Sequence, residues 1–254
     1  MAGRLEGKVA IVTGSTSGIG KGTAVMMARE GARVTVTGRS AERGEQVVAA
    51  IRAAGGEAHF VQADVTRAAD CARLVQETVL RYGGLDILVN NAAIFPRGRI
   101  DTTTEELWDQ IMAVNLKAPF LCCQQAVPQM RRRGGGAIIN VGSVNAYIGG
   151  TDLLAYATSK GGLMTFTKNL AAALAKDRIR VNLVNPGWVL TEGEDEMQRS
   201  LGRPDNWAEI AAGQQPFGRL LTPEDIAYAI VYLASDEAAL VNGAVLTVNQ
   251  TPVN

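Results

Sequence analysis

A tyrosine and a lysine stand four residues apart in this chain, at Tyr156 and Lys160. The segment around them, residues 155–175, is rich in strong helix formers, so both side chains are predicted to lie on one face of a helix. Free tyrosine titrates near pH ~10, and a close ammonium group lowers the pKa because it stabilises the phenolate. The pair could therefore act as a general acid or base near neutral pH. On its own, this spacing is more often found in a helix with a half-buried tyrosine and a solvated lysine.

Histidine and cysteine content excludes several other kinds of chemistry. The chain has a single histidine, His59, and no Gly-x-Ser-x-Gly motif, so a Ser-His-Asp hydrolase is not expected. The three cysteines, Cys71, Cys122 and Cys123, show neither metal-binding nor redox spacing. We therefore expect reduced, structural thiols and no bound metal.

The overall composition favours one domain that spans residues 1–254, because no break in composition divides the chain. Lys and Arg number 25, as do Asp and Glu, and this balance predicts neither nucleic acid nor a membrane surface as a partner. The N-terminus is short and polar, and no apolar run approaches the roughly 18 residues of a spanning helix. We expect a cytoplasmic protein that acts on a small molecule.

A glycine-rich turn lies between a β-rich run, residues 8–13, and a helical pattern, residues 21–30. Glycines let a backbone approach a diphosphate closely, and the first free N–H groups of a helix attract negative charge. Such a turn also occurs with no ligand, but here its flanking elements have the types and the order that a dinucleotide site requires. The turn contains Gly14, Ser17, Gly18, Ile19 and Gly20.

The pattern Thr-Gly-x-x-x-Gly-Ile-Gly, which begins at Thr13, resembles the signature of the classical short-chain dehydrogenases/reductases, and the resemblance extends along nearly the whole chain. It implies an α/β fold with a single Rossmann-type doubly wound parallel sheet of about seven strands and helices on both faces. It also implies a nicotinamide dinucleotide at the carboxyl ends of the strands. The implied reaction interconverts an alcohol and a carbonyl.

Four residues match the catalytic positions of that family. The resemblance implies that Ser143, which follows a predicted strand over residues 137–141, holds the reacting oxygen, and that Tyr156 transfers the proton. It implies that Lys160 lowers the pKa of the phenol and positions the ribose, and that Asn115 supports a water in the proton relay. Each residue alone has an ordinary explanation, such as a turn serine or a packing asparagine. Their joint match favours catalysis over a silent nucleotide-binding scaffold.

The exit of the second predicted strand, residues 33–37, carries Gly38 and Arg39. NAD-preferring relatives have an acidic residue there for the free ribose 2′-hydroxyl, whereas an arginine suits the 2′-phosphate of NADP. We therefore predict NADP, with NAD as the alternative; Ser17 argues for NAD, because many NADP-preferring members have a basic residue there. The resemblance also implies cofactor contacts from Asp64, Val65, Asn91, Ala92, Tyr156, Lys160, Pro186, Gly187, Val189 and Thr191. A cap on the next helix is an equally good explanation of Asp64.

Thr103 and Glu106 form a predicted capping box that would open a long helix reaching about Arg131. The resemblance implies a homotetramer in which this helix and the helix over residues 155–175 pair between subunits.

Three segments are expected to line the substrate pocket: residues 94–97, residues 144–150, and a polar stretch around residues 188–215 that we interpret as a lid. A solvated helix pair is the alternative to a lid. Aromatic side chains alternate with polar groups there, which favours a sugar or polyol, because aromatic faces pack on sugar C–H groups. A 3-oxoacyl thioester or a simple ketone is the alternative substrate. The predicted substrate contacts are Phe95, Ser143, Asn145, Tyr156 and Trp188.

Overall fold

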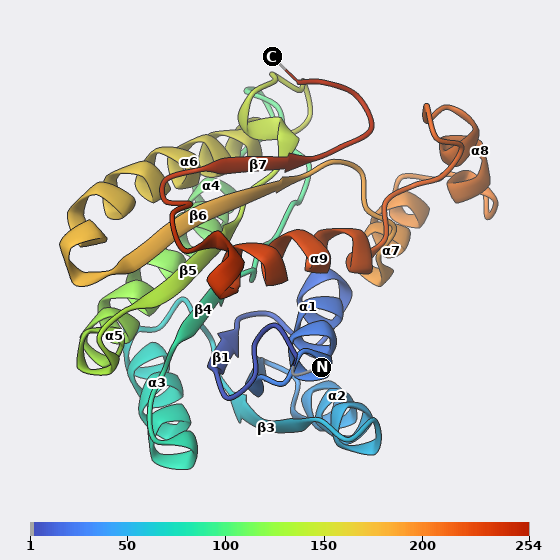
Figure 1. Cartoon of the computed structure of the whole chain (residues 1–254). Coiled ribbons are helices and arrows are strands. Elements are labelled where there is room, and N and C mark those ends of the chain that lie inside the picture. The colour runs from blue at the N-terminus through green and yellow to red at the C-terminus, as the bar shows by residue number, and fades with distance from the viewer. Residues whose placement is uncertain (1–2, 254) are drawn as a thin grey trace.

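The computed structural model describes residues 3–253. Seven parallel strands form one sheet in the order β3-β2-β1-β4-β5-β6-β7 (Figure 1). The order reverses between β1 and β4, and such a reversal opens a crevice at the carboxyl ends of the strands. The predicted doubly wound α/β fold is therefore confirmed. The strands are β1 (Val9–Val12), β2 (Arg33–Gly38), β3 (Glu57–Gln62), β4 (Ile87–Asn90), β5 (Gly136–Val141), β6 (Ile179–Pro186) and β7 (Val245–Val248).

Helices cover both faces of the sheet. One face packs against α1 (Gly18–Arg29), α2 (Ala41–Ala53) and α9 (Pro223–Ala234). The other packs against α3 (Ala68–Tyr82), α5 (Ala118–Arg133) and α6 (Leu154–Leu174). The shorter helices are α4 (Glu105–Met112), α7 (Glu192–Ser200) and α8 (Trp207–Gly213), and short 3₁₀ turns span Val144–Ala146, Ala175–Asp177 and Asp236–Ala238. Figure 1 shows α7 and α8 beyond the sheet, on the side toward which β6 and β7 point.

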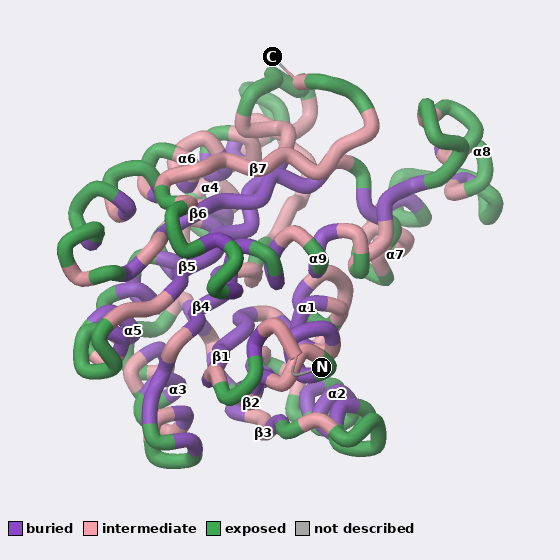
Figure 2. The backbone as a smooth tube through the Cα atoms, in the orientation of Figure 1, coloured by how far each residue is buried: buried purple, intermediate pink, exposed green. Residues whose placement is uncertain are grey.

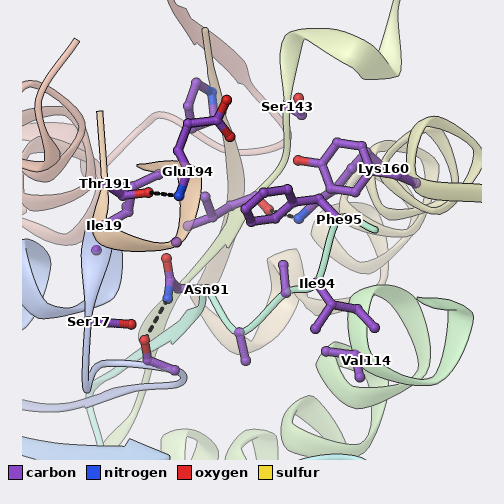
Figure 3. A pocket seen from close by; sticks show the side chains of 18 of the residues that line it. Ser17, Ile19, Asn91, Ile94, Phe95, Val114, Ser143, Lys160, Thr191 and Glu194 are labelled. Atoms are coloured by element: carbon purple, nitrogen blue, oxygen red, sulfur yellow. Dashed lines mark hydrogen bonds between the residues drawn. The ribbon is translucent and has the colours of Figure 1, made fainter. Parts of the chain in front are cut away.

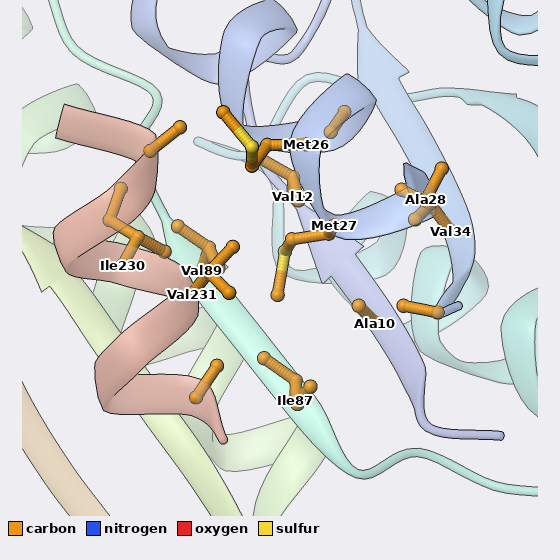
Figure 4. Packing of buried hydrophobic residues seen from close by; sticks show 14 of the residues in the cluster. Ala10, Val12, Met26, Met27, Ala28, Val34, Ile87, Val89, Ile230 and Val231 are labelled. Carbon is orange, nitrogen blue, oxygen red and sulfur yellow. The ribbon is translucent and has the colours of Figure 1, made fainter. Parts of the chain in front are cut away.

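Strand β1 shows why the core has two halves. Ala10 and Val12 belong to the hydrophobic cluster under α1, α2 and α9, whereas Val9 and Ile11 belong to the cluster under α3, α5 and α6. Successive residues of a strand point to opposite faces, so a parallel strand covered on both faces is apolar at every position. Figure 2 shows the central strands buried, and Figure 4 shows α1 and α9 meeting over β1 and β4.

The start of α4 differs from the prediction by one residue. Thr104, not Thr103, is the N-cap, and its Oγ1 accepts a hydrogen bond of 3.2 Å from the backbone N of Leu107. The backbone N of Thr103 instead donates to the carbonyl of Arg99, 2.8 Å away. The predicted capping box at Thr103 and Glu106 is therefore wrong, because a preceding turn holds Thr103, the second of three adjacent threonines.

The predicted long helix over residues 103–131 is divided by a wide π-type turn at Ala113–Lys117, between α4 and α5. Pro119 follows this turn and has no N–H to donate to the carbonyl of Asn115, four residues earlier. The backbone N of Ala118 reaches back five residues to the carbonyl of Ala113 instead. A single proline thus explains the wider turn, and it leaves the carbonyl of Asn115 without its helical partner.

The remaining predicted elements lie within a few residues of their predicted positions. Ser40 caps α2, where its hydroxyl accepts from the backbone N of Arg43, and Thr222 caps α9 with Asp225 in a complete capping box. Within residues 3–253, none of the helices combines the length and the apolar character that crossing a membrane requires.

Candidate active site

A cleft of about 740 Å³ runs along the carboxyl edge of the sheet, from the glycine turn after β1 to the start of α6 and the segment before α7 (Figure 3). Two predicted site residues, Gly20 and Asn115, do not line it. The predicted residues that do line it are Gly14, Ser17, Gly18, Ile19, Arg39, Asp64, Val65, Asn91, Ala92, Phe95, Ser143, Asn145, Tyr156, Lys160, Pro186, Gly187, Trp188, Val189 and Thr191.

The glycine turn has room for backbone only. Gly14 has φ +62°, and a Cβ there would stand 2.8 Å from the Cα of Ala92. A Cβ at Gly20 would overlap the side-chain nitrogen of Asn91 and the carbonyl oxygen of Gly14. Asn91 in turn donates to the carbonyl of Thr13 at 2.9 Å, which ties the ends of β1 and β4 together. Gly20 therefore shapes the turn without lining the cleft.

A carboxylate from α7 lies on the N-terminus of α1. The backbone N of Gly18 donates to Oε2 of Glu192 at 3.0 Å. Helix α1 has no acidic residue in its first turn, and its N-cap, Ser17, makes no side-chain capping bond. The positive end of the helix dipole explains why an anion is stable at this position. This contact could not be predicted from the sequence, since the two residues lie far apart along the chain.

The far end of the cleft carries two arginines. Arg39 lies at the exit of β2, and Arg43 lies four residues later in the first turn of α2. Both are exposed, and neither has an ion-pair partner within residues 3–253. Arg43 was not predicted, although its helical spacing from Arg39 could have identified it.

Asp64 lies on the same side of the cleft and also holds a turn. Its Oδ1 accepts from the backbone N and the hydroxyl of Thr66, at 3.0 Å and 2.7 Å. The N-cap of α3 is Arg67, so Asp64 does not cap that helix. Because Asp64 lines the cleft while it fixes this turn, its carboxylate is held in position.

Tyr156 lies in the first turn of α6, with its ring edge-on to Phe95 at a centroid distance of 6.3 Å. Burial has the largest effect on its phenol and raises the pKa above the ordinary value of 10.0. Hydrogen bonding with Ser143 and the charge of Arg97 lower the pKa, whereas the charge of Glu194 raises it. The net direction is upward. In the protein without a ligand, the phenol is therefore a weaker acid than free tyrosine.

Lys160 is buried at the floor of the cleft. Its Nζ donates to the carbonyl of Val141 at 2.8 Å and lies 5.7 Å from the centroid of the Tyr156 ring. Burial lowers the pKa of Lys160 to about 8. In this structure the Lys160 ammonium is directed at a backbone carbonyl and burial disfavours its charged form, so the expected lowering of the Tyr156 pKa by Lys160 stays a prediction.

Ser143 is fixed by its neighbours at the end of β5. Its backbone N donates to Oδ1 of Asn185 at 2.8 Å, and its Oγ accepts from the backbone N and Nδ2 of Asn145, both at 3.2 Å. Gly142 leaves the space that the carboxamide of Asn185 fills. Asn185, from β6, was not predicted, since nothing in its local sequence points to Ser143.

Asn115 connects three parts of the chain behind the cleft. Its Oδ1 accepts from the backbone N of Ile94 at 2.9 Å, and its Nδ2 donates to the carbonyl of Ile94 at 2.8 Å and to Oγ of Ser159 at 3.1 Å. The side chain is buried and fully hydrogen-bonded. Pro119 has no N–H to donate to the backbone carbonyl of Asn115.

The predicted lid stretch contains two short helices, α7 and α8, rather than irregular chain. Trp188 stacks on Trp207 with a centroid distance of 6.0 Å, and its Nε1 donates to Oε1 of Glu194 at 2.8 Å. Trp207 donates to Oδ1 of Asp195 at 2.8 Å. The two tryptophans therefore join the pair of helices to the wall of the cleft.

Comparison with known proteins gives a consistent result over the whole chain. A family model described as Enoyl-(Acyl carrier protein) reductase matches residues 14–250. An uncharacterized oxidoreductase of Thermotoga maritima is 42% identical and is matched over 96% of either chain. The 3-oxoacyl-(acyl-carrier-protein) reductase FabG of the same organism is 37% identical over 97% of this chain and 98% of its own. Cyclopentanol dehydrogenase of Comamonas sp. is 37% identical, with 97% of either chain covered.

The architecture is equally well matched. A crystal structure of a Burkholderia xenovorans protein superposes with a TM-score of 0.92 at 35% identity, and the match covers 98% of this chain and 97% of that chain.

The burial of Lys160 leads to a prediction about stability. Folding lowers the pKa of Lys160 from 10.5 to about 8, so the folded state disfavours the ammonium, and stability is lost as the pH falls from 10.5 to about 8. We expect Lys160→Met to raise the free energy of unfolding at pH 7 by about 2 kcal/mol, after about 1 kcal/mol is deducted for the lost hydrogen bond to Val141. Urea unfolding at pH 7 and pH 9.5 measures this effect, which should shrink at the higher pH. Lys168→Met, at an exposed position of α6, is the control; a Lys160→Met variant less stable than wild type at pH 7 contradicts the prediction.

Proposed function

The chain belongs to the short-chain dehydrogenase/reductase family, and from this membership we propose that it moves a hydride between NADP(H) and the carbinol or carbonyl carbon of a small polar substrate. The observation that carries the proposal is the convergence of Tyr156, Ser143 and Lys160 on one cleft, whose other end is the glycine turn. A rival is a nucleotide-binding scaffold without activity. Three reactive side chains on one cleft argue against it.

The proposed proton transfer uses groups of this chain. In the oxidation direction, Ser143 holds the substrate oxygen, and the phenolate of Tyr156 accepts the hydroxyl proton. The bound cofactor supplies the hydride acceptor. Lys160, with a pKa of about 8, exchanges protons near neutral pH and passes the proton on. We infer that Asn115 supports a water of this relay through its backbone carbonyl, because its side chain already bonds to Ile94 and Ser159.

The residues along the cleft fit a nicotinamide dinucleotide. Backbone N–H groups at the start of α1 suit a diphosphate, and Arg39 and Arg43 suit a ribose 2′-phosphate, which favours NADP over NAD. We propose that the remaining contacts come from Gly14, Ser17, Gly18, Ile19, Gly20, Asp64, Val65, Asn91, Ala92, Tyr156, Lys160, Pro186, Gly187, Val189 and Thr191. The carboxylate of Glu192 occupies the same N–H group that a diphosphate would use, so it must leave when the cofactor binds.

For the substrate, we propose a sugar or polyol. Phe95 and Trp188 offer aromatic faces to sugar C–H groups, and Asn145 lies beside Ser143 to bind a hydroxyl. The names of two relatives support other classes, a 3-oxoacyl thioester and an alicyclic alcohol. A screen of polyols, aldoses, ketones and acyl thioesters with NADP(H) separates these classes.

We further propose one domain over residues 1–254, a lid around residues 188–215, a cytoplasmic location and a homotetramer. The bracing of α7 and α8 by Trp188 and Trp207 supports a lid that moves as a unit. An apolar groove between α6 and the segment from α4 to the start of α5, with Phe120 at 44% exposure, supports pairing of these helices between subunits.

The proposed role of Tyr156 predicts that Tyr156→Phe lowers kcat by about 10²- to 10⁴-fold, because the phenol oxygen that takes the substrate proton is lost. The dissociation constant for NADPH should stay within about twofold, since the ring remains. Steady-state kinetics and a fluorescence titration measure the two effects. Tyr147→Phe, at an exposed position outside the cleft, should leave both unchanged. A Tyr156→Phe enzyme that keeps a tenth of wild-type kcat overturns the assignment.

The two arginines predict the cofactor preference. Arg39→Ala and Arg43→Ala should each lower kcat/KM for NADP by about ten- to a hundredfold, the value of a charge-assisted contact to phosphate, and should leave NAD use unchanged. Arg67→Ala is the matched control, because Arg67 is exposed nearby but does not line the cleft. Equal use of NAD and NADP by the wild-type enzyme disproves the preference.

The contact between Glu192 and Gly18 predicts that Glu192→Gln tightens NADPH binding. The neutral amide no longer repels the diphosphate, and a charge at a helix end is worth about two- to fivefold in affinity. Calorimetric titration at low ionic strength measures the change, which should diminish in high salt. Glu196→Gln, on the same helix but without a hydrogen-bond partner in residues 3–253, should have no effect. Weaker binding by Glu192→Gln contradicts the prediction.

A further inference from the structure

Arg97 is a cation on the substrate side of the cleft that no acidic side chain neutralises. It lines the cleft together with Phe95, Ser143 and Tyr156. Its Nε is enclosed by protein and has no hydrogen-bond partner. Within residues 3–253, Arg97 forms no ion pair with any carboxylate. A guanidinium group that is partly removed from water without a partner is unfavourable, so this side chain is suited to an anion from outside the chain.

The acidic residues near Arg97 are already engaged elsewhere. Asp152 pairs with Arg99, which stands two residues after Arg97 and does not line the cleft. Glu194 accepts hydrogen bonds from Nε1 of Trp188 and from Nε2 of Gln198, at 2.8 Å and 2.7 Å. Asp152 is committed chiefly to Arg99, and neither carboxylate forms an ion pair with Arg97 within residues 3–253.

The guanidinium of Arg97 lies close enough to the phenol of Tyr156 to act on it. The charge of Arg97 lowers the pKa of Tyr156, and the charge of Glu194 raises it. A substrate whose reacting oxygen contacts Tyr156 thus lies within reach of a positive group and of a negative one. Figure 3 shows Glu194 beside Thr191, to one side of Phe95 and Ser143.

We propose that Arg97 binds a carboxylate of the substrate, so that the preferred substrate is a hydroxy acid, or its oxo acid, rather than a neutral polyol. One guanidinium group and one carboxylate form a bidentate pair whose charges balance. A doubly charged phosphate fits less well, because Arg97 would neutralise only one of its charges and Glu194 would repel it. The hydroxyls of a polyhydroxy acid can still bond to polar groups such as Asn145. This inference rests on the proposed dehydrogenase/reductase function and names the substrate class within it.

The test compares matched pairs of substrates that differ only in the acidic group. The purified full-length enzyme is assayed in the oxidation direction with gluconate and glucitol, glycerate and glycerol, and 3-hydroxybutanoate and butane-1,3-diol. At least one acid should exceed its neutral partner about tenfold or more in kcat/KM. Arg97→Gln should lower that value for the acid by about ten- to a hundredfold, chiefly through KM, and should leave the neutral partner within about twofold. Arg97→Lys should recover part of the loss.

Arg67→Gln is the control, because it removes an exposed arginine that lies outside the cleft and forms no ion pair within residues 3–253, and it should leave both members of each pair unchanged. The wild-type comparison needs no variant, so the inference remains testable even if Arg97→Gln does not fold.

Two outcomes overturn the inference and leave the proposed function intact. In the first, neutral substrates or phosphorylated polyols turn over faster than every acid. In the second, Arg97→Gln lowers kcat/KM equally for acids and neutral partners. If no member of any class is oxidised or reduced, the proposed function fails and the inference fails with it.

Discussion

A parallel sheet brings the carboxyl ends of all its strands to one edge, and every part of the candidate site depends on this constraint. The glycine turn follows β1, Arg39 follows β2, Asn91 follows β4 and Ser143 follows β5, so residues far apart in the sequence line one cleft. Helices on both faces hide the remaining surface of the sheet in two hydrophobic clusters. The edge is therefore where polar side chains and backbone groups can meet a ligand.

Buried and half-buried amides hold this edge together. Asn91 joins the ends of β1 and β4, Asn115 joins the loop at Ile94 to α6, and Asn185 joins β6 to the backbone of Ser143. A carboxamide is both donor and acceptor, so it can satisfy two backbone groups in loops where no strand partner is present. These residues position the reactive groups without contact with the substrate.

Positive and negative side chains are distributed unevenly around the cleft, and their positions affect which ligands can bind there. Glu192 lies on the positive end of α1, Glu194 bonds to Trp188, and Arg39 and Arg97 have no acidic partner within residues 3–253. The two unpaired arginines lie at opposite ends of the cleft. Such an arrangement suits two negatively charged ligands that bind together, a phosphorylated cofactor at one end of the cleft and an acidic substrate at the other.

The sequence by itself determined the features that a few neighbouring residues encode. The glycine turn, the Tyr156 and Lys160 spacing and the order of strands and helices were all predictable, because turn geometry and helical or strand periodicity depend on local residues. Only the tertiary structure decided that Thr104 rather than Thr103 caps α4, that Glu192 reaches Gly18, and that burial raises the pKa of Tyr156. Each of these features depends on which residues are neighbours in space, and those neighbours come from segments that are far apart in the sequence.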